Sequence, residues 1–229
     1  MKITIIIPFY NEEKRIEIER FHQIFNNYLQ YDFILVDDGS TDDTSIILNE
    51  FKNKFPNLTI LKLDKNVGKA EAIRAAVLSI STTDFIVYYD ADLATPFSEM
   101  EKLIQFSVLH QNYKMVMGAR IKLIGNQVKR SLKRHYFGRI FATIVSQFVL
   151  KVAVYDTQCG AKVIDFETAK PIFSKPFISK WLFDVELLKR LQKIHNLNEV
   201  VKEIPLEEGQ RNIQPEKEKP INPNIIQQP

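Results

Sequence analysis

Two aspartates close a hydrophobic stretch near the middle of the chain. In "VYYDADLATP" (residues 87–96), an apolar run leads directly into Asp90 and Asp92, and one alanine separates the two acids. Carboxylates this close repel each other unless a cation or a set of hydrogen-bond donors lies between them. Closely spaced oxygen ligands suit Mg²⁺ or Mn²⁺, which could bridge a diphosphate there. We therefore predict a divalent metal site at Asp90 and Asp92.

Two more polar clusters also follow apolar runs. "PFYNEE" (8–13) comes after the β-branched run at 3–7, and "DDGSTDDT" (37–44) comes after "DFILV". Each has a structural alternative, because Asn11 and Glu12 can cap a helix and "DGSTDD" is ordinary turn chemistry. Three polar clusters that end three apolar runs together favour a binding site.

The segments around these clusters alternate between strand and helix patterns. Apolar runs predict strands at 3–7, 32–40, 58–63, 84–92 and 114–118. Amphipathic or Ala-rich segments predict helices at 12–30, 40–55, 68–80 and 98–111. This order predicts an α/β fold with a mostly parallel central sheet flanked by helices, in which ligands bind beyond the carboxyl ends of the strands. We expect one domain over residues 1–210 and a disordered, Pro-, Asn- and Gln-rich tail over 211–229.

Composition and glycine spacing exclude several classes of protein. No G-x-G-x-x-G follows the first strand, and "NVGKAEA" lacks the earlier glycine and the Ser/Thr of a P-loop. The net charge of +3 is too small for non-specific nucleic-acid binding, so we expect no nucleic-acid partner. The single cysteine fits a reducing cytosol. No apolar stretch reaches the roughly 20 residues of a spanning helix. We therefore expect a cytoplasmic protein, soluble or peripheral on the cytoplasmic face of a membrane.

Six segments in a fixed order resemble a known family. They are "IIIPFYNEE", "LVDDGSTDDT", "NVGKAEAIRAA", "DADLATP", "DTQCGAKV" and "WLFDVELL". The set resembles the inverting family-2 glycosyltransferases of GT-A fold, and most of all the branch that makes dolichyl- or polyprenyl-phosphate glucose. The resemblance covers about residues 1–208. It implies transfer of a hexose, glucose from UDP-glucose, to a polyprenyl or dolichyl phosphate, with Mg²⁺ or Mn²⁺ as cofactor.

The resemblance also implies a nucleotide site. Val36 and Asp38 would lie beside the uracil or ribose, and Asp92 would be the more direct metal ligand of the pair with Asp90. Lys69 would lie near the base, and a solvated lysine at a helix start is its alternative. The implied nucleotide contacts are Pro8, Tyr10, Asn11, Glu12, Val36, Asp38, Lys69, Asp90, Ala91, Asp92 and Arg120.

The resemblance assigns further residues to the acceptor and to catalysis. Arg130, Arg134 and Gln158 would meet phosphates or the acceptor, since the planar fork of arginine matches phosphate oxygens. A solvated basic helix is the alternative for the two arginines. Asp156 and Asp184 would be the catalytic residues, near the sugar and the acceptor. Because an acceptor phosphate is already ionised at neutral pH, Asp184 would orient rather than deprotonate, and a helix-capping role is its alternative.

Two positions depart from the family pattern. Related mannose enzymes carry Gln two residues after the second acid, where this chain has Ala94, so water or donor oxygens would complete the metal shell. After the last strand the family commonly has an aromatic residue and a Gly-Ser-Lys stretch, but "PLEEGQRN" offers only Gly209 and Arg211. Two other functions therefore stay open: a family-2 transferase with a sugar hydroxyl acceptor in surface polysaccharide synthesis, and a non-catalytic nucleotide-sugar-binding module.

A basic aromatic segment could bring the site to a lipid-linked phosphate. A basic amphipathic helix with aromatic side chains can lie in an anionic membrane interface. An ordinary helix packed on the sheet, with its cations in water, is the alternative. The residues concerned are Lys129, Arg130, Lys133, Arg134, Tyr136, Phe137, Arg139, Ile140 and Phe141.

Overall fold

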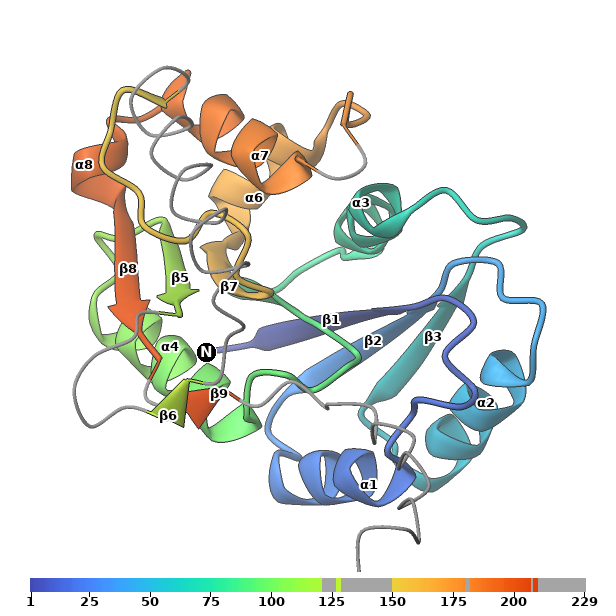
Figure 1. Cartoon of the computed structure of the whole chain (residues 1–229). Coiled ribbons are helices and arrows are strands. Elements are labelled where there is room, and N and C mark those ends of the chain that lie inside the picture. The colour runs from blue at the N-terminus through green and yellow to red at the C-terminus, as the bar shows by residue number, and fades with distance from the viewer. Residues whose placement is uncertain (121–126, 129–149, 180–181, 207, 210–229) are drawn as a thin grey trace, which may run out of the picture.

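A seven-stranded sheet runs through the middle of the molecule (Figure 1). The computed structural model describes residues 1–120, 127–128, 150–179, 182–206 and 208–209. The strand order is β3-β2-β1-β4-β7-β5-β8. The strands are β1 (Ile3–Phe9), β2 (Asp32–Asp37), β3 (Leu58–Lys62), β4 (Phe85–Tyr89), β5 (Met115–Ala119), β7 (Ala161–Asp165) and β8 (Val201–Pro205).

One strand of this sheet runs against the others. β7 pairs antiparallel with both β4 and β5, and every other pair in the sheet is parallel. The predicted mostly parallel sheet is therefore confirmed, and β7 is the exception. Two short strands, β6 (Gln127–Val128) and β9 (Glu208–Gly209), form a separate parallel pair.

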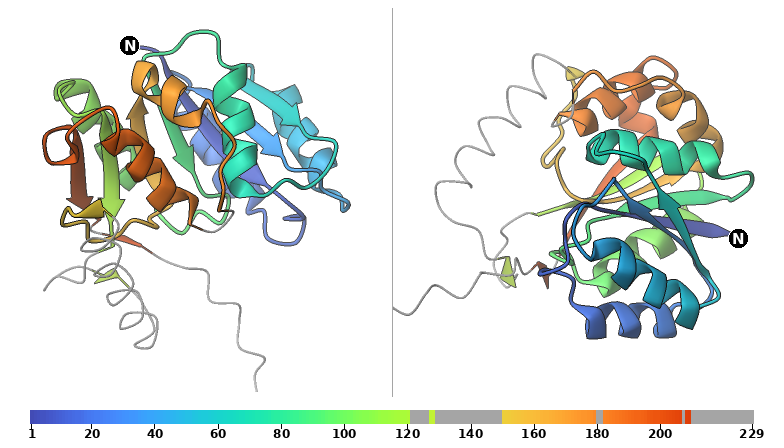
Figure 2. Two further views of the ribbon diagram at one scale, coloured as in Figure 1. Left: turned by 90° about the horizontal axis from the view of Figure 1, so that it is seen from above. Right: turned by 90° about the vertical axis from the view of Figure 1, so that its right-hand side faces the viewer.

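Helices cover both faces of the sheet, as the right-hand view of Figure 2 shows. The helices α1 (Ile18–Asn27), α2 (Thr44–Lys54) and α4 (Phe97–Leu109) pack on one face. The other face carries α3 (Lys69–Ser79), α6 (Phe166–Phe173), α7 (Phe183–Gln192) and the short α8 (Leu197–Val200). Successive side chains of a strand point to opposite faces, so Ile5 and Ile7 pack toward α1 while Ile6 packs toward α3. A strand buried on both faces reads as a continuous apolar run, which explains "ITIII" at the N-terminus.

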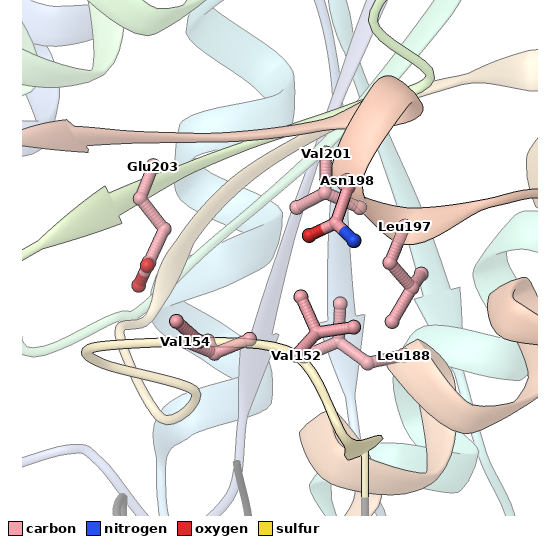
Figure 3. Close-up of a pocket in the computed structure, with 8 residues that line it drawn as sticks. Val152, Val154, Leu188, Leu197, Asn198, Val201 and Glu203 are labelled. Atoms are coloured by element: carbon pink, nitrogen blue, oxygen red, sulfur yellow. The ribbon is translucent and has the colours of Figure 1, made fainter. Parts of the chain in front are cut away.

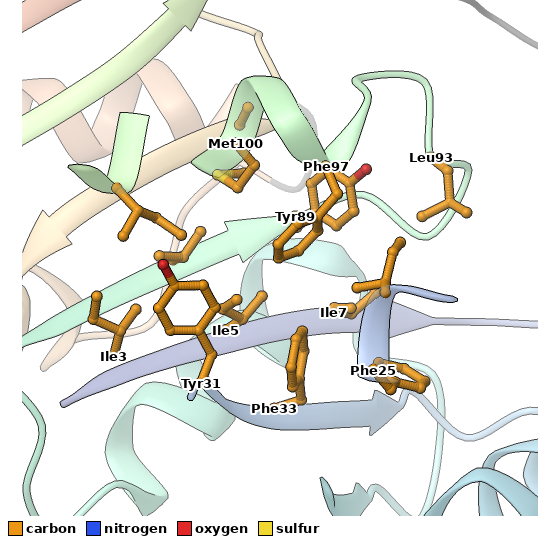
Figure 4. Packing of buried hydrophobic residues seen from close by; sticks show 14 of the residues in the cluster. Ile3, Ile5, Ile7, Phe25, Tyr31, Phe33, Tyr89, Leu93, Phe97 and Met100 are labelled. Atoms are coloured by element: carbon orange, nitrogen blue, oxygen red, sulfur yellow. The ribbon is translucent and has the colours of Figure 1, made fainter. Parts of the chain in front are cut away.

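An aromatic cluster fixes the start of the turn that carries the two acids (Figure 4). The Tyr89 ring meets Phe97 edge to face, with 5.5 Å between centroids, and its hydroxyl donates a hydrogen bond to the Thr95 carbonyl. Phe97 also lies 4.3 Å from the Tyr28 ring, which extends the cluster to the end of α1. The segment between Tyr89 and Phe97, which contains Asp90 and Asp92, is thus held at both ends.

Two helices begin later than their sequence patterns predict. The helix expected from residue 12 begins at Ile18, and the one expected from residue 40 begins at Thr44. The amides of Asn11 and Glu12 instead donate to side chains of the 40–44 segment, so both segments form interlocked loops. Among the described helices, none has the length and hydropathy needed to span a bilayer. The expected tail over 211–229 lies outside the described residues.

Candidate active site

The loops after β1 and β2 hold each other at the carboxyl edge of the sheet. The Asn11 amide donates to Ser40 Oγ at 3.1 Å, and Asn11 Oδ1 accepts from the Thr41 amide at 2.8 Å. The Glu12 amide donates to Thr44 Oγ1 at 2.9 Å. Asn11 adopts a positive φ of 50°, which asparagine tolerates better than most residues. Its side-chain oxygen therefore braces the second loop and does not cap a helix of its own.

Asp38 organises the turn that leads into α3. Its carboxylate is 2% exposed and accepts three hydrogen bonds, from Asn66 Nδ2 at 3.1 Å, from the Val67 amide at 2.8 Å and from the Gly68 amide at 2.9 Å. Gly39 beside it has a φ of +67°, and a Cβ there would lie 2.4 Å from the Lys65 carbonyl carbon. The Asp38 carboxylate thus places the start of α3, which carries Lys69.

Lys69 and Asp90 form an ion pair across the edge of the sheet. Lys69 Nζ contacts Asp90 Oδ1 and lies 5.8 Å from the centroid of the Phe183 ring. Burial alone would lower the pKa of Lys69, but the carboxylates of Asp90, Asp184 and Asp92 outweigh burial and raise it. The ammonium therefore stays charged near these acids, although 36% of the side chain is exposed, and the expected contact of Lys69 with a nucleotide base remains a prediction.

Gly160 makes room for the Asp90 carboxylate. A Cβ on Gly160 would lie 1.9 Å from Asp90 Oδ2 and 2.4 Å from its Cγ. No real Cβ contact is this short, so the glycine lets the segment before β7 lie directly against the acid. Asp90 thus pairs with Lys69 through one oxygen, and its other oxygen lies where a side chain at position 160 would be.

Asp92 lies exposed on the turn that follows. Its Oδ1 accepts the Ala94 amide at 3.0 Å, and the Leu93 amide donates to the Asp90 carbonyl at 3.2 Å. Burial raises the pKa of Glu12, the charge of Arg15 opposes that rise, and the charges of Asp92 and Asp42 add to it. Asp92 is therefore near enough to the β1 loop to repel Glu12, so the ends of β1 and β4 meet at one site.

The two acids fit a cation that binds together with a substrate. No group of three or more His, Cys, Asp or Glu side chains suited to a metal occurs in the part of the chain that the structure describes. Mg²⁺ is usually bound by one or two carboxylates plus substrate phosphates and water, not by a closed protein cage. Asp90 and Asp92 match that requirement, and Ala94 supplies only its amide to Asp92.

Arg120 is bound to Asp156 through both arms of its guanidinium. Nε donates to Asp156 Oδ2 at 2.7 Å and Nη2 donates to Oδ1 at 2.9 Å, while Nη2 also donates to the Gln158 carbonyl at 3.0 Å. Burial opposes the charge of Arg120, but the hydrogen bonds and charge of Asp156 raise its pKa further. The expected nucleotide contact of Arg120 remains a prediction, and in this structure Asp156 binds its guanidinium.

Asp184 lies in a buried cluster at the start of α7. Lys162 Nζ donates to Asp184 Oδ1 at 2.8 Å and to the Cys159 carbonyl at 2.6 Å, and the Tyr88 hydroxyl donates to the same Oδ1. Burial, and then the charge of Asp184, raise the pKa of Tyr88 well above its usual value, so Tyr88 remains a donor. Leu182 is the N-cap residue of α7, without a side-chain capping bond, so the capping alternative for Asp184 is wrong.

A family match agrees with this geometry. The model described as Glycosyl transferase family 2 matches residues 4–173. The chain belongs to this family. The predicted α/β GT-A fold and the family resemblance are thereby confirmed.

Individual relatives of this family-2 chain point to one branch. It is 32% identical over 207 residues to a dolichyl-phosphate beta-glucosyltransferase of Dictyostelium discoideum. This match covers 84% of this chain and 63% of the relative. It is 33% identical over 198 residues to a dolichyl-phosphate beta-glucosyltransferase of Trichomonas vaginalis, over 81% of this chain and 58% of the relative. The chain thus spans about 60% of the length of these curated relatives.

A solved structure shares the fold. It is glucosyl-3-phosphoglycerate synthase from Mycobacterium tuberculosis in complex with Mn²⁺ and uridine-diphosphate-glucose, with a TM-score of 0.68 and 18% identity. The match covers 93% of this chain and 72% of that one.

Two functional candidates of this family-2 chain escaped the sequence reasoning. Lys162 lies inside "DTQCGAKV" and is wholly buried, and Tyr88 lies opposite it on β4. Lysine is almost never fully buried unless it is paired. A lysine in the middle of the apolar segment "AKVID" was therefore a usable signal for a buried acid partner.

Some of the remaining expected site residues lie in the described part of the structure, and others lie outside it. Val36 is wholly buried in the sheet under α3, so its expected nucleotide contact remains a prediction, while Tyr10 is 42% exposed at the edge. Pro8 and Ala91 are half-buried, as is Gln158, whose carbonyl accepts Arg120. Arg130, Arg134 and Arg211 lie outside the described residues, and so does the whole basic aromatic segment.

A small cavity lies between the 152–154 segment, α7, α8 and β8, and neither Asp90 nor Asp92 lines it (Figure 3). Its volume is about 140 Å³, and Val152, Leu188, Leu197 and Glu203 are among its lining residues. Ligand pockets usually start at about 300 Å³, so this cavity is too small for a nucleotide sugar. Glu203 also accepts the Asp156 amide at 2.9 Å, which supports Asp156 from behind.

Proposed function

We propose that this chain is a metal-dependent, inverting hexosyltransferase that moves glucose from UDP-glucose to a polyprenyl or dolichyl phosphate. The observation that carries the proposal is the convergence of Asp90, Asp92, Lys69 and Asp184 at the carboxyl edge of the sheet. The names of the two relatives support the acceptor and the sugar. The Mn²⁺ and UDP-glucose named with the solved neighbour support the donor and the cation.

Asp90 and Asp92 would hold Mg²⁺ or Mn²⁺ together with the donor diphosphate. A bound divalent cation would neutralise the charge that develops on the departing nucleoside diphosphate. Asp90 is already fixed by Lys69 and Gly160, so its carboxylate needs little ordering when the donor binds. The exposed Asp92 remains accessible to a cation that arrives from solvent.

Transfer would be a single displacement at the anomeric carbon. An acceptor phosphate oxygen forms the new bond as the bond to the UDP oxygen breaks, which inverts the configuration. The acceptor is ionised at neutral pH, so no general base is required for this step. Asp184 has one oxygen engaged by Lys162 and Tyr88, which suits a fixed carboxylate that orients a substrate hydroxyl.

The experiment is a donor and acceptor screen with the purified chain. UDP- and GDP-sugars are mixed with Mg²⁺ or Mn²⁺ and a short polyprenyl phosphate, and both the released nucleotide and the glycolipid are measured. We expect UDP release and glycolipid formation with UDP-glucose, and loss of both with EDTA. Turnover only with sugar hydroxyl acceptors would overturn the lipid-phosphate proposal. UDP-glucose binding without turnover on any acceptor would favour the non-catalytic module.

Peripheral membrane contact is part of the same proposal. The basic aromatic segment would bring the chain to a membrane that holds the acceptor, by attraction to anionic lipids. Flotation with anionic and with neutral liposomes tests this contact. Neutralising Arg130 and Arg134 is expected to release the chain from anionic liposomes.

A further inference from the structure

A buried lysine holds the acid at the start of α7. We propose that Lys162 is a positioning residue for glycosyl transfer, which holds the Asp184 carboxylate in one orientation beside the Lys69–Asp90 pair. This inference rests on the proposed function, and it concerns how Asp184 is prepared for its role rather than a direct contact of Lys162 with substrate.

The register of the sheet brings two donors to one oxygen of Asp184. Lys162 on β7 lies directly opposite Tyr88 on β4, and the lysine Nζ is 5.2 Å from the centroid of the Tyr88 ring. Both side chains lie on the sheet face that carries α7, and both donate to Asp184 Oδ1. An acid that receives two donors from a rigid sheet has one orientation.

Asp184 belongs to a group of four charged side chains. Lys162 pairs with it at 2.8 Å, the charge of Asp184 raises the pKa of Lys69, and Lys69 pairs with Asp90. Without Lys162, Lys69 would be the one lysine of this group left to compensate the negative charges of both Asp184 and Asp90. A buried carboxylate near a like charge is repelled and moves unless a cation compensates its charge.

Stability alone does not account for this ion pair. Lys162 is wholly buried and Asp184 is 6% exposed, so both charges lost their hydration on folding. Replacing such a pair by apolar residues is often neutral or stabilising, so a buried ion pair is weak evidence of a stabilising role. A role at the neighbouring acid site explains why the chain carries a charge at this position of β7.

The test is a double-mutant cycle with Lys162→Met and Asp184→Asn. Per folded molecule, K162M is expected to lower kcat about 10- to 100-fold, the range found when residues that orient active-site ligands are removed. The KM for UDP-glucose is expected to change less than about threefold, because Lys162 is wholly buried and offers no surface to a substrate. In the D184N background, K162M should lower kcat no further, since the lysine acts only through Asp184.

Two further variants keep the result interpretable. K170M removes a surface lysine that pairs with Glu167 at 2.7 Å, and it is expected to leave kcat unchanged. Y88F removes the other donor to Asp184 Oδ1 and should lower kcat less than K162M, because it removes no charge. Thermal unfolding of the four cycle proteins without substrate measures the Lys162–Asp184 coupling independently of any assay of activity.

The outcomes separate this inference from the proposed function. If wild-type protein does not glycosylate a polyprenyl phosphate, the proposed function fails before any variant is compared, and the cycle is then run on the acceptor that turns over. If K162M has wild-type kcat per folded molecule, or if the losses in K162M and D184N multiply, the positioning role is overturned. A loss of activity that only follows the loss of folded protein would also overturn it.

Discussion

Adding one methyl group at Gly160 should damage the acid pair more than the fold. A Cβ there would lie 1.9 Å from Asp90 Oδ2, while real Cβ contacts essentially never fall under 3.0 Å, so the carboxylate must move by at least about 1 Å. That movement pulls Asp90 away from Lys69, its partner on the other oxygen. Displacing a catalytic group by about 1 Å can cost about 100-fold in rate. We therefore expect Gly160→Ala to lower kcat/KM for UDP-glucose about 100-fold and to weaken the response to Mg²⁺ or Mn²⁺.

The cost to stability should be small, because the clashing atoms are the end of a side chain. Overpacking usually costs about 1–3 kcal/mol, and Asp90 has room to turn toward solvent. Gly118→Ala is the matched control: its Cβ would meet Leu206 Cδ2 at 2.8 Å, in the core. G118A should lower the free energy of unfolding by a similar amount and keep kcat/KM per folded molecule. Wild-type kcat/KM and metal response in G160A would refute the claim that the placement of Asp90 matters.

Three further predictions concern the neighbouring side chains. Asp92→Asn should lower kcat about 100-fold or more and raise the Mn²⁺ concentration needed for the half-maximal rate. A metal titration of the rate measures both effects. Unchanged turnover would contradict the metal site. Arg120→Lys keeps the positive charge but loses the two-armed bond to Asp156. The kcat/KM measured in steady-state assays should therefore fall about tenfold. Wild-type rates would show that the two-armed bond of Arg120 is not needed. Burial, and then the charge of Asp156, raise the pKa of Cys159 from 9.0 to about 11. The folded state therefore favours the thiol, and its contribution to the free energy of unfolding is full below about pH 9 and is lost as the pH rises to about 11. Urea unfolding at pH 8 and pH 10.5 should show this loss in wild type and a smaller one in Cys159→Ala.

The layered fold could be predicted because its signals are local. Each strand buried on both faces is a continuous apolar run, and each polar cluster follows such a run directly. The direction of β7 could not be predicted in this way, since "AKVID" has the same pattern in either orientation. The late starts of α1 and α2 depend on bonds between segments about 30 residues apart, such as the Thr41 amide to Asn11 Oδ1, which local propensity does not reveal.

The acids of the site could be predicted, but their partners could not. Asp90, Asp92, Asp156 and Asp184 all stand in short motifs that carry the family resemblance. What fixes Asp184 is Tyr88, 96 residues away, and Lys162, 22 residues away. The Gly160–Asp90 contact depends in the same way on the approach of two strands. Such contacts follow from strand order and register, which a single sequence does not specify.

The partners of these acids explain how this edge of the sheet could accept the proposed donor diphosphate. Asp184 is paired with Lys162, Asp90 with Lys69, and Asp156 with Arg120, so each of these carboxylates is balanced by a cation already in the fold. A diphosphate alone would still meet Asp92 and Glu12 at the mouth of the site, and a like charge there repels it. In the proposed mechanism a divalent cation would remove that repulsion, and the diphosphate would supply the oxygen ligands that Ala94 does not. The cation and the donor diphosphate should therefore each improve the binding of the other. The donor should bind weakly when either the cation or the Asp92 carboxylate is absent.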